Sequence, residues 1–333
     1  MRIWYDACTG KHIRYGVAIA KRFRKNGHDV VFTTRAHPDT VSLAKLLGED
    51  PVVLGKYAPS SLSNRLEESA KRMVALTQLF KDNVPDVALA HQSVELCRVA
   101  FGLGIPIVLT ADTPHAEAVN RLTVPLAKVL VTSEAIPNRF YKHYGAQEIV
   151  QFRGVDEVAW IKDFKPLQSF EFKAPTIVVR QMETRASYAL GQEDDSVVLA
   201  RKLTALGNVL FISRYDRTCK EGLIVGEEFT DSASVVADAA MVVSAGGTIS
   251  REAALQGVPS IVVSGIGKTY VNTYLARKGF PLFISTADKA INLAKGLIGK
   301  RYDVRSKLAK LESPIDIIEK TALQAGRSKA IKG

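Results

Sequence analysis

The sequence has few cysteines and no long apolar run. Its three cysteines, Cys8, Cys97 and Cys219, are far apart and lack metal-ligand spacing, which argues against a disulfide framework or a zinc site and favours reduced thiols. No apolar stretch approaches the roughly 20 residues needed to cross a bilayer. Residues 1–6 have the pattern of a strand rather than of a signal peptide. These absences predict a cytoplasmic globular protein.

Acidic residues are the scarcer charged class. The chain has 45 Lys and Arg against 34 Asp and Glu, a formal net charge of +11, with a local basic excess over residues 300–332. The basic residues are not interleaved with aromatics and no recognition motif is present, so we expect no nucleic-acid partner. Three interpretations of the positive charge remain: the protein is simply a basic cytoplasmic protein, it binds an anionic substrate, or it contacts an anionic membrane face.

Short apolar runs alternate with amphipathic stretches throughout the chain. In the first half we expect strands at residues 2–6, 30–34, 52–54, 87–90, 105–110, 129–132 and 148–151, and helices at 13–26, 39–47, 63–81, 94–102 and 115–126. In the second half we expect strands at 176–180, 209–213, 241–243 and 260–263, and helices at 196–206, 231–237, 249–256, 269–278 and 287–297. This alternation predicts an α/β protein with doubly wound, Rossmann-like parallel sheets.

The length of 333 residues favours two domains rather than one core. The periodicity weakens over residues 154–175, so we expect Rossmann-like domains at 1–160 and 170–310 that face a cleft. Ligands of such sheets bind beyond the carboxyl ends of the strands. The remaining segment, 311–333, has a good helix start at Ser313-Pro314. We expect it to form a helix that packs back toward the N-terminal domain.

The most informative segment joins two apolar runs through a glycine turn. Ser244 ends the first run, Gly246, Gly247 and Thr248 form the turn, and Glu252 lies in the short helix that follows. The start of a helix after a glycine turn presents unpaired N–H groups and the positive end of the helix dipole, which suits a phosphate or diphosphate. Glu252 is placed to bind an adjacent ribose. The same spacing also fits a strand–helix connection that binds no ligand.

Polar residues follow several strands of the first half. His12 comes after the first strand, His91 ends the fourth, and Asp112 with His115 follows the fifth. An imidazole at such an edge acts as a base near neutral pH, and Asp112 would orient His115. The alternative for each histidine is a structural role, and a His/Asp metal site lacks tight ligand spacing, so we expect no metal. Thr9-Gly10-Lys11 resembles the end of a phosphate loop but lacks its first glycine and its Ser/Thr.

Arginines follow the strands of the second half. Arg180 ends the first of them and is expected to hold a diphosphate through paired N–H donors. Arg214 ends the next strand, and Arg185 and Tyr188 lie between the two. A surface ion pair is an equally good interpretation of Arg185.

Together these residues resemble the family named domain of unknown function 354, found mainly in archaea and bacteria. The resemblance spans nearly the whole chain. It is carried by Asp6 with His12, 27–30, 34–35, 85–87, 104–106, Asp112 with His115, 154–157, 179–180, and 245–248 with 251–254. That family is similar in turn to glycosyltransferases of the GT-B type and to UDP-N-acetylglucosamine 2-epimerases. The resemblance implies two facing Rossmann-like domains, with Gly246, Gly247 and Thr248 on the diphosphate and Glu252 on the ribose.

The resemblance also places His12 where the peptidoglycan lipid-linked N-acetylglucosaminyltransferases have a glycine-rich acceptor loop containing a histidine. Here that loop has one glycine rather than several. We therefore expect the acceptor, or the way in which it binds, to differ from that of this group of transferases.

Three functions are compatible with these features. The first is a metal-independent GT-B glycosyltransferase that uses a nucleoside-diphosphate sugar as substrate and needs no cofactor, with His12 or the Asp112/His115 pair as base. The second is a nucleotide-sugar 2-epimerase, and the third is a non-catalytic protein that binds a nucleotide sugar. The basic region at 300–332 favours a lipid-linked acceptor and peripheral contact at the inner, cytoplasmic membrane face.

Overall fold

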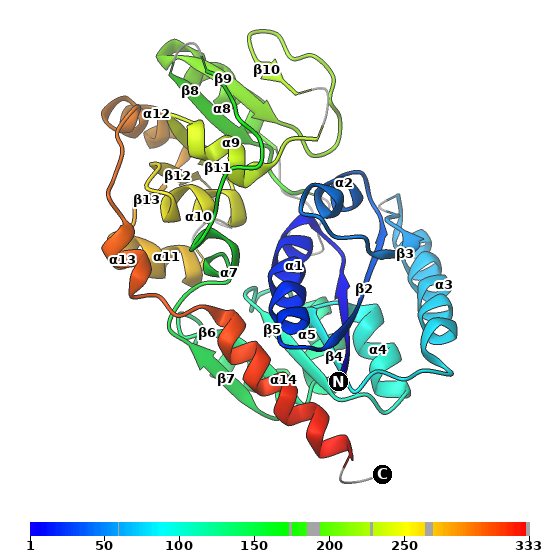
Figure 1. Ribbon diagram of the computed structural model, residues 1–333. Coiled ribbons are helices and arrows are strands. Elements are labelled where there is room, and N and C mark those ends of the chain that lie inside the picture. Colours follow the sequence, from blue (N-terminus) through cyan, green and yellow to red (C-terminus); the bar gives the residue numbers. More distant parts are fainter. Residues whose placement is uncertain (59, 173–174, 185–193, 227–228, 264–268, 331–333) are drawn as a thin grey trace. The chain divides into compact units, whose positions relative to one another are not determined.

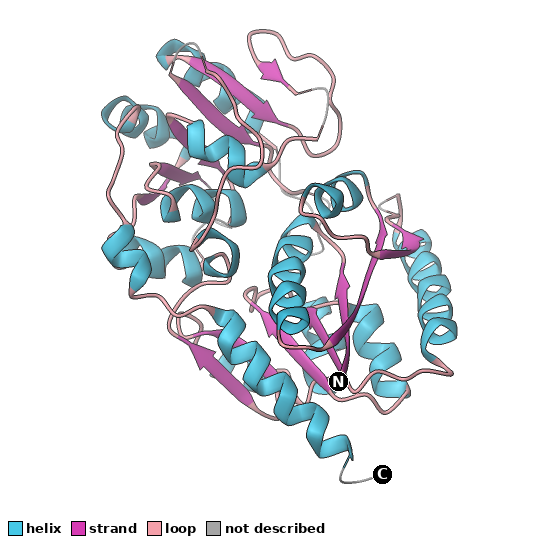
Figure 2. Cartoon of the chain, viewed as in Figure 1, coloured by secondary structure: helices cyan, strands magenta, loops and turns pink. Residues whose placement is uncertain are grey.

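The computed structural model describes residues 1–333 except 59, 173–174, 185–193, 227–228, 264–268 and 331–333 (Figure 1). The chain divides into two compact units. Unit 1 comprises residues 1–160 and 312–333, and unit 2 comprises residues 161–311. Each unit is an α/β structure, as the distribution of helices and strands in Figure 2 shows.

Unit 1 is built on a seven-stranded sheet in the order β3-β2-β1-β4-β5-β6-β7, and its recorded strand pairings are parallel. The strands are β1 (Arg2–Ala7), β2 (Asp29–Ala36), β3 (Val52–Lys56), β4 (Val87–His91), β5 (Ile107–Ala111), β6 (Val129–Ser133) and β7 (Ile149–Phe152). The helices are α1 (Gly10–Lys25), α2 (Pro38–Leu46), α3 (Leu62–Phe80), α4 (Val94–Gly102), α5 (Glu117–Thr123), α6 (Arg139–His143) and α14 (Pro314–Ala330), with a 3₁₀ turn at Val124–Leu126.

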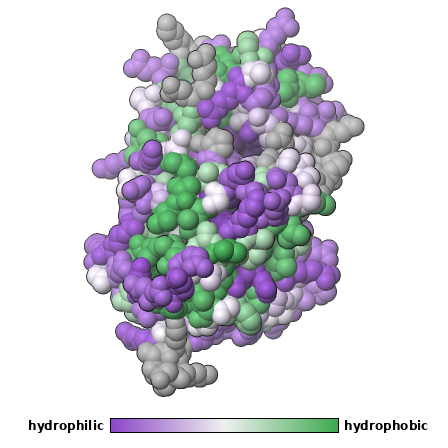
Figure 3. Space-filling view, turned by 90° about the vertical axis from the view of Figure 1, so that its right-hand side faces the viewer, coloured by the Kyte–Doolittle hydropathy of each residue, from purple (hydrophilic) through white to green (hydrophobic). Residues whose placement is uncertain are grey.

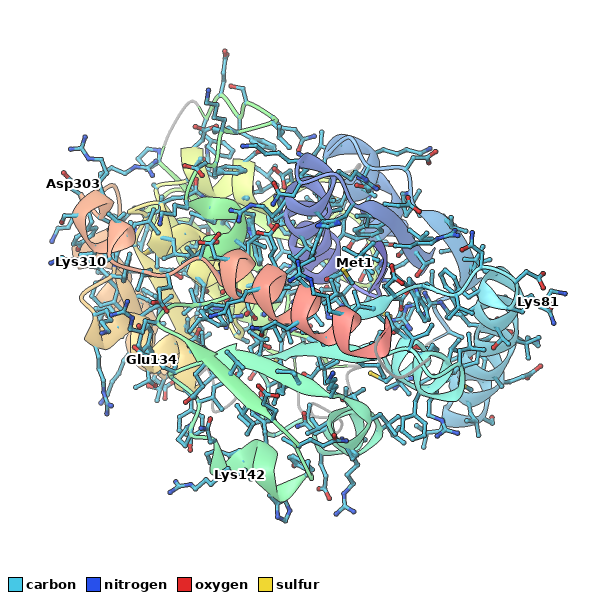
Figure 4. The ribbon with its side chains drawn as sticks, turned by 60° about the horizontal axis from the view of Figure 1, so that its bottom comes forward. Met1, Lys81, Glu134, Lys142, Asp303 and Lys310 are labelled. Carbon is cyan, nitrogen blue, oxygen red and sulfur yellow. The ribbon has the colours of Figure 1, made fainter. Side chains whose placement is uncertain are left out.

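Helices cover both faces of the unit 1 sheet. α1 packs against α2 on one side and α14 on the other, whereas α3, α4 and α5 pack in sequence over the opposite face. Strands β4, β5 and β6 are buried along their whole length, which explains their continuous apolar runs. Figure 4 shows α14 running across this unit beside Met1. The contact is close, because a Cβ added at Gly326 would lie 1.9 Å from Cε of Met1.

Unit 2 contains a six-stranded sheet in the order β10-β9-β8-β11-β12-β13, again with parallel pairings. The strands are β8 (Thr176–Arg180), β9 (Asn208–Ile212), β10 (Ile224–Val225), β11 (Met241–Ser244), β12 (Ser260–Val263) and β13 (Leu282–Ser285). The helices are α8 (Ser196–Leu203), α9 (Ser232–Asp238), α10 (Thr248–Leu255), α11 (Tyr270–Arg277), α12 (Ala287–Leu297) and α13 (Arg305–Ala309), with a 3₁₀ turn at Thr204–Leu206. A further short helix, α7 (Val158–Ile161), lies where the chain passes from unit 1 to unit 2.

Alternate residues of β8 separate the core of unit 2 into two layers. Ile177 and Val179 pack with α8 and α12, whereas Val178 packs with α9 and α10. Successive side chains of a strand point to opposite faces, so this short strand contributes to both layers.

The predicted fold class, with two Rossmann-like parallel sheets, is confirmed. The expected strands and helices all have a counterpart, with shifts of a few residues at their ends. The sequence pattern missed α6, α7, α13, β10 and β13. The helices among these have only four or five residues, β10 has two, and β13 is a half-exposed strand at the edge of the sheet.

Both sheets reverse their strand order at one point. The reversal lies between β1 and β4 in unit 1 and between β8 and β11 in unit 2. Open α/β sheets bind ligands beyond the carboxyl ends of the strands at such a reversal. The residues after these four strands are therefore the first to examine for a site.

Part of the surface is apolar. Figure 3 views the side on which α3 lies, where green apolar areas interrupt the polar surface. On α3 the exposed apolar side chains include Leu62, Leu66 and Val74, and on β3 they include Val52 and Val53. Among the described residues, the structure contains no helix both long and apolar enough to cross a membrane.

Candidate functional site

The glycine turn of unit 2 lies at the carboxyl end of β11. The Ser244 hydroxyl donates to the carbonyl of Gly246 (2.7 Å) and accepts from the Gly246 N–H (3.2 Å), which fixes the turn. Gly247 is the N-cap of α10 and, having no side chain, makes no side-chain cap. A Cβ added at Gly246 would have no atom within 4 Å, so the space there is open, whereas a Cβ added at Gly247 would lie 2.4 Å from Nη1 of Arg251. The turn thus offers accessible backbone at Gly246 and a helix N-terminus bordered by the Arg251 guanidinium, and both features suit an anion.

Arg180 lies beside this turn at the same edge of the sheet. It is the last residue of β8 and is paired in register with Ser244, the last residue of β11. Its guanidinium Nη1 donates to the carbonyl of Ser213 at 3.2 Å. The structure therefore brings Arg180, Ser244 and the Gly246–Thr248 turn together at the strand-order reversal of unit 2.

Glu252 lies one turn into α10 and is fully buried. Its Oε2 accepts a hydrogen bond of 2.8 Å from the hydroxyl of Ser232, the first residue of α9. This hydrogen bond between Ser232 and Glu252 links α9 to α10. The expected role of Glu252 on a ribose stays a prediction.

Sequence reasoning missed Gln181, which follows Arg180. Its side-chain carbonyl accepts from Ser213 Oγ (3.0 Å) and from the Arg214 N–H (2.8 Å), and its amide donates to Asp194 (2.8 Å). The Arg214 guanidinium donates in turn to the Gln181 backbone carbonyl at 2.8 Å. Arg214 thus holds the loops after β8 and β9 together. Arg185 and Tyr188 lie outside the described residues.

In unit 1 a buried ion pair lies directly beneath the strand-order reversal. Asp6 in β1 accepts hydrogen bonds from Arg72 Nη1 (3.0 Å) and Nη2 (2.6 Å), and from the hydroxyls of Thr33 (2.6 Å) and Ser93 (2.5 Å). The exposed fractions of the Asp6 and Arg72 side chains are 0% and 1%. These bonds tie β1 to β2, α3 and the loop after β4. Asp6 is therefore an internal anchor for the polar edge.

A second polar cluster surrounds the ammonium of Lys11. Lys11 Nζ lies 2.6 Å from Oδ2 of Asp112, 2.7 Å from Oδ2 of Asp156 and 3.9 Å from Oε1 of Glu157. His91 completes the cluster, with Nε2 3.3 Å from Oδ1 of Asp112 and Nδ1 3.9 Å from Oδ2 of Asp156. These residues come from the start of α1 and from the ends of β4, β5 and β7. We refer to them as the Lys11 cluster.

The Lys11 cluster contains one predicted catalytic residue and lies next to another. Asp112 is a member, with the imidazole of His91 beside it at 3.3 Å. His115 is near enough to Asp112 for the carboxylate to raise its pKa, against a larger lowering by burial. The rings of His12 and His91 lie edge to face with their centroids 5.0 Å apart. His91 was among the histidines expected to act as a base at this edge, whereas no role was expected for Lys11, Asp156 or Glu157.

His12 is held as a neutral imidazole. Burial, followed by the neighbouring charges of His91 and Lys11, lowers the pKa of His12 well below its ordinary value. Its Nδ1 accepts from the backbone N–H of Cys8 at 3.3 Å. With Nδ1 accepting this bond, the neutral ring carries its proton on Nε2. The expected role of His12 as a base stays a prediction.

A comparison with protein families identifies the chain. The model of the family described as "Protein of unknown function (DUF354)" matches residues 1–326. The chain belongs to the DUF354 family. A relative, the uncharacterized protein MJ0665 of Methanocaldococcus jannaschii, is 30% identical over 95% of this chain and 96% of its own length.

Solved structures with a similar fold include a 2-epimerase and glycosyltransferases. The UDP-GlcNAc 2-epimerase of Neisseria meningitidis bound to UDP-GlcNAc has a TM-score of 0.70 at 15% identity, covering 97% of this chain and 100% of that one. The spinosyn forosaminyltransferase SpnP has a TM-score of 0.63 at 16% identity, with 98% and 99% covered. The glycosyltransferase VinC in complex with dTDP has a TM-score of 0.60 at 14% identity, with 98% and 100% covered. At these identities the likeness of this DUF354 protein establishes the fold it shares with GT-B glycosyltransferases and 2-epimerases.

Proposed function

We propose that this DUF354 protein is a GT-B glycosyltransferase that moves a sugar from a nucleoside-diphosphate sugar to an acceptor hydroxyl. The observation that carries the proposal is the open glycine turn at Gly246, which starts α10 at the strand-order reversal of unit 2. This is the position at which the fold class binds phosphates. Two of the structural neighbours are complexes with UDP-GlcNAc and dTDP, which supports the choice of ligand.

The proposal assigns donor binding to unit 2. The N–H groups of Gly247 and Thr248 and the dipole of α10 would hold the diphosphate, with Arg180 as a second source of positive charge. The same groups would stabilise the negative charge that appears on the diphosphate when the bond to the anomeric carbon breaks. No step of the transfer passes through a metal ion. Glu252 is kept as the candidate ligand of the ribose.

The proposal assigns acceptor activation to unit 1. Asp112 is the proposed base, because its carboxylate reaches the edge of the Lys11 cluster, with 12% of its side chain exposed against 3% for Asp156. The acceptor hydroxyl would lose its proton to Asp112, and its oxygen would form a bond to the anomeric carbon as the diphosphate leaves. His12 would hydrogen-bond to the acceptor as a donor through Nε2.

Calorimetric titration tests donor binding. UDP, GDP, dTDP and CDP sugars are titrated into wild type, Gly246→Glu and Gly296→Glu. Both glycines have open space around their Cβ position, so each glutamate fits the fold and both variants gain the same charge. Gly296 lies in α12, away from the turn. We expect one nucleotide sugar to bind wild type and Gly296→Glu and to lose at least tenfold in affinity in Gly246→Glu. Equal affinity in all three proteins would remove the turn as the donor site.

Product analysis separates the remaining functions. A transferase releases nucleoside diphosphate and a glycoside, and Asp112→Asn should reduce that release while donor binding persists. The 2-epimerase is favoured by one observation, that acid and base groups are already gathered in the Lys11 cluster without an acceptor. It would yield a C2 epimer with no free diphosphate. Tight binding without turnover would indicate a non-catalytic binding protein.

The acceptor is proposed to be lipid-linked, because the basic region 300–332 favours an anionic membrane face. The structure divides this region, since residues 300–311 belong to unit 2 and the rest to unit 1. Sedimentation with phosphatidylglycerol vesicles at low and high salt tests the contact. Equal recovery with neutral vesicles would contradict it.

A further inference from the structure

The two glycines of the turn before α10 have different surroundings. A Cβ added at Gly246 would meet no atom within 4 Å, whereas a Cβ added at Gly247 would lie 2.4, 2.8 and 2.9 Å from Nη1, Cζ and Nη2 of Arg251. These three atoms belong to one guanidinium, so this group lies directly against the Cα of Gly247. Gly246 therefore leaves space for a ligand, and Gly247 leaves space for the Arg251 side chain.

The position of Arg251 in α10 explains this contact. Arg251 comes four residues after Gly247, and residues four apart lie on the same face of a helix. Long side chains of a helix also point back toward its N-terminus. The Arg251 side chain thus runs back to the start of α10. Its Nη1 donates to Oδ1 of Asn272 in α11 at 3.3 Å, which helps to hold the guanidinium at this place.

Two positive potentials coincide at the start of α10. One is the positive end of the helix dipole, and the other is the guanidinium charge of Arg251. A cation near a helix N-terminus is repelled by the dipole, whereas an anion at Gly246 would be attracted by the dipole and by the guanidinium together. Arg251 is only 4% exposed, so water screens its charge weakly and strengthens its attraction for an anion in the turn.

Arg180 brings a second guanidinium to the same edge of the sheet. It is paired in register with Ser244, the residue that precedes the turn and fixes it. A guanidinium binds phosphate oxygens through paired N–H donors. Two such groups and a helix N-terminus suit a ligand with two linked phosphates better than a ligand with a single phosphate.

We propose that Arg251 is a specificity-determining residue of this turn, where it binds the diphosphate of the ligand together with the N–H groups of α10. The site then distinguishes ligands by charge. A free nucleoside diphosphate carries more negative charge than the same diphosphate esterified to a sugar, so it binds more tightly. The proposal rests on the proposed function only in placing a diphosphate at this turn. Inorganic pyrophosphate, which contains neither base nor sugar, therefore tests it separately.

Calorimetric titration with pyrophosphate tests the role of the charge. We expect Arg251→Ala to bind pyrophosphate about tenfold more weakly than wild type, or worse, because a charge-assisted hydrogen-bond donor is lost. Arg251→Lys keeps the charge and should recover part of the affinity. Arg277→Ala is the matched control, because Arg277 is the exposed last residue of α11 and its loss removes the same charge from unit 2. It should bind as wild type does.

Gly247→Ala tests the contact itself. The added methyl group would overlap the guanidinium, which is the far end of a flexible side chain, so the fold should persist while the guanidinium is pushed out of the turn. We expect a loss of pyrophosphate affinity similar to that of Arg251→Ala. The double variant should bind no more weakly than Arg251→Ala alone, because the same guanidinium is lost only once. Circular dichroism of each ligand-free variant verifies that it is folded.

Several outcomes would overturn the proposal. These are absence of pyrophosphate binding to wild type, equal affinity in wild type and Arg251→Ala, and additive losses in the double variant. Arg251→Lys binding as weakly as Arg251→Ala, with a lowered melting temperature in both, would also overturn it, because the side chain would then support the helix rather than the anion.

The same titrations separate this proposal from the proposed function. Pyrophosphate binding that depends on Arg251, in a protein that binds no nucleotide sugar, would support the role of Arg251 and contradict glycosyl transfer. Nucleotide-sugar binding that depends on Gly246 but is unchanged in Arg251→Ala would support donor binding at the turn and overturn the role of Arg251.

Discussion

Breaking the buried ion pair between Asp6 and Arg72 should strongly destabilise unit 1. Arg72→Met removes two charge-assisted hydrogen bonds of 3.0 and 2.6 Å to Asp6 and one of 2.9 Å to the Leu54 carbonyl, and it leaves the Asp6 carboxylate buried with only hydroxyl and thiol partners. Breaking such a pair typically costs about 3–5 kcal/mol, because the remaining charge has neither water nor a counter-ion. Lys71→Met is the matched control. Lys71 is the preceding residue of α3, 60% exposed, and its pairs with Glu67 and Glu68 are screened by solvent, so they should contribute little to stability.

Tryptophan fluorescence during urea unfolding measures this effect in unit 1 alone. The chain has two tryptophans, Trp4 and Trp160, and both lie in unit 1. Trp4 is also close to the perturbation, since its indole donates to Thr33 (2.8 Å), the same hydroxyl that donates to Asp6. With a denaturant slope of about 2–3 kcal/mol per molar, the loss should lower the urea midpoint by about 1–2 M.

The double variant tests the physical reason. Asp6→Leu with Arg72→Met removes both charges of the pair, and it should be more stable than Arg72→Met alone, because the fully buried Asp6 carboxylate is then gone and only Glu95, 3.7 Å from the Arg72 guanidinium, has lost a cationic neighbour. A midpoint for Arg72→Met equal to that of Lys71→Met would refute the reasoning. It would show that Asp6 does not carry an uncompensated charge in the folded protein.

Two further predictions concern reactivity and backbone geometry. Burial, followed by the Asp6 carboxylate, raises the pKa of the Cys8 thiol to about 12, and burial likewise raises the pKa of the Cys97 thiol. Iodoacetamide at pH 8 should therefore alkylate native protein at the exposed Cys219 only. In denaturant it should alkylate all three cysteines. Peptide mass mapping reads this out, and fast native labelling of Cys8 below pH 10 would contradict the stated environment. Gly257→Ala should destabilise unit 2, because Gly257 has φ of +78° and an added Cβ would lie 2.1 Å from the carbonyl oxygen of Tyr302. Circular dichroism melting should show a loss of several degrees, and an unchanged melting temperature would mean that the Tyr302 segment moves aside freely.

The sheets could be predicted from the sequence because buried parallel strands produce continuous apolar runs. The strands β4, β5 and β6 are fully buried and each was anticipated within a few residues. β13 was missed although β12 is equally short and also follows a proline, and the two differ in burial: all four residues of β12 are buried, whereas β13 is an edge strand in which only Leu282 is buried. Local pattern therefore identifies buried strands better than half-exposed edge strands and the shortest helices.

The site could be predicted only in part, because distance in space depends on strand order. The turn at Gly246 is local in sequence, so its position at the end of β11 followed directly from the pattern. The Lys11 cluster is not local. His91 and Asp112 are 21 residues apart, and Asp156 follows 44 residues later. No spacing rule relates them, and they meet because β4, β5, β6 and β7 are consecutive in the sheet.

Asp6 shows what an isolated charge in an apolar strand indicates. The residues Ile3, Trp4, Tyr5 and Ala7 around it are all buried, and so is Asp6. A carboxylate in such a run needs a cationic partner, which the sequence could not locate because Arg72 is 66 residues away. The buried charge could be recognised in the sequence, but Arg72 could be identified as its partner only from the fold.

The division of the chain has a consequence for the order in which the protein is made. Unit 1 begins at Met1 and finishes only with α14, which lies after all of unit 2. Ribosomes deliver the chain from the N-terminus at about 5–20 residues per second, so unit 2 can complete its core while the β4–β6 face of unit 1 still lacks its last helix. During that interval the nascent chain presents an incomplete sheet. A message truncated before Glu312 would release a product in which unit 2 is whole and unit 1 is a target for chaperones and proteases.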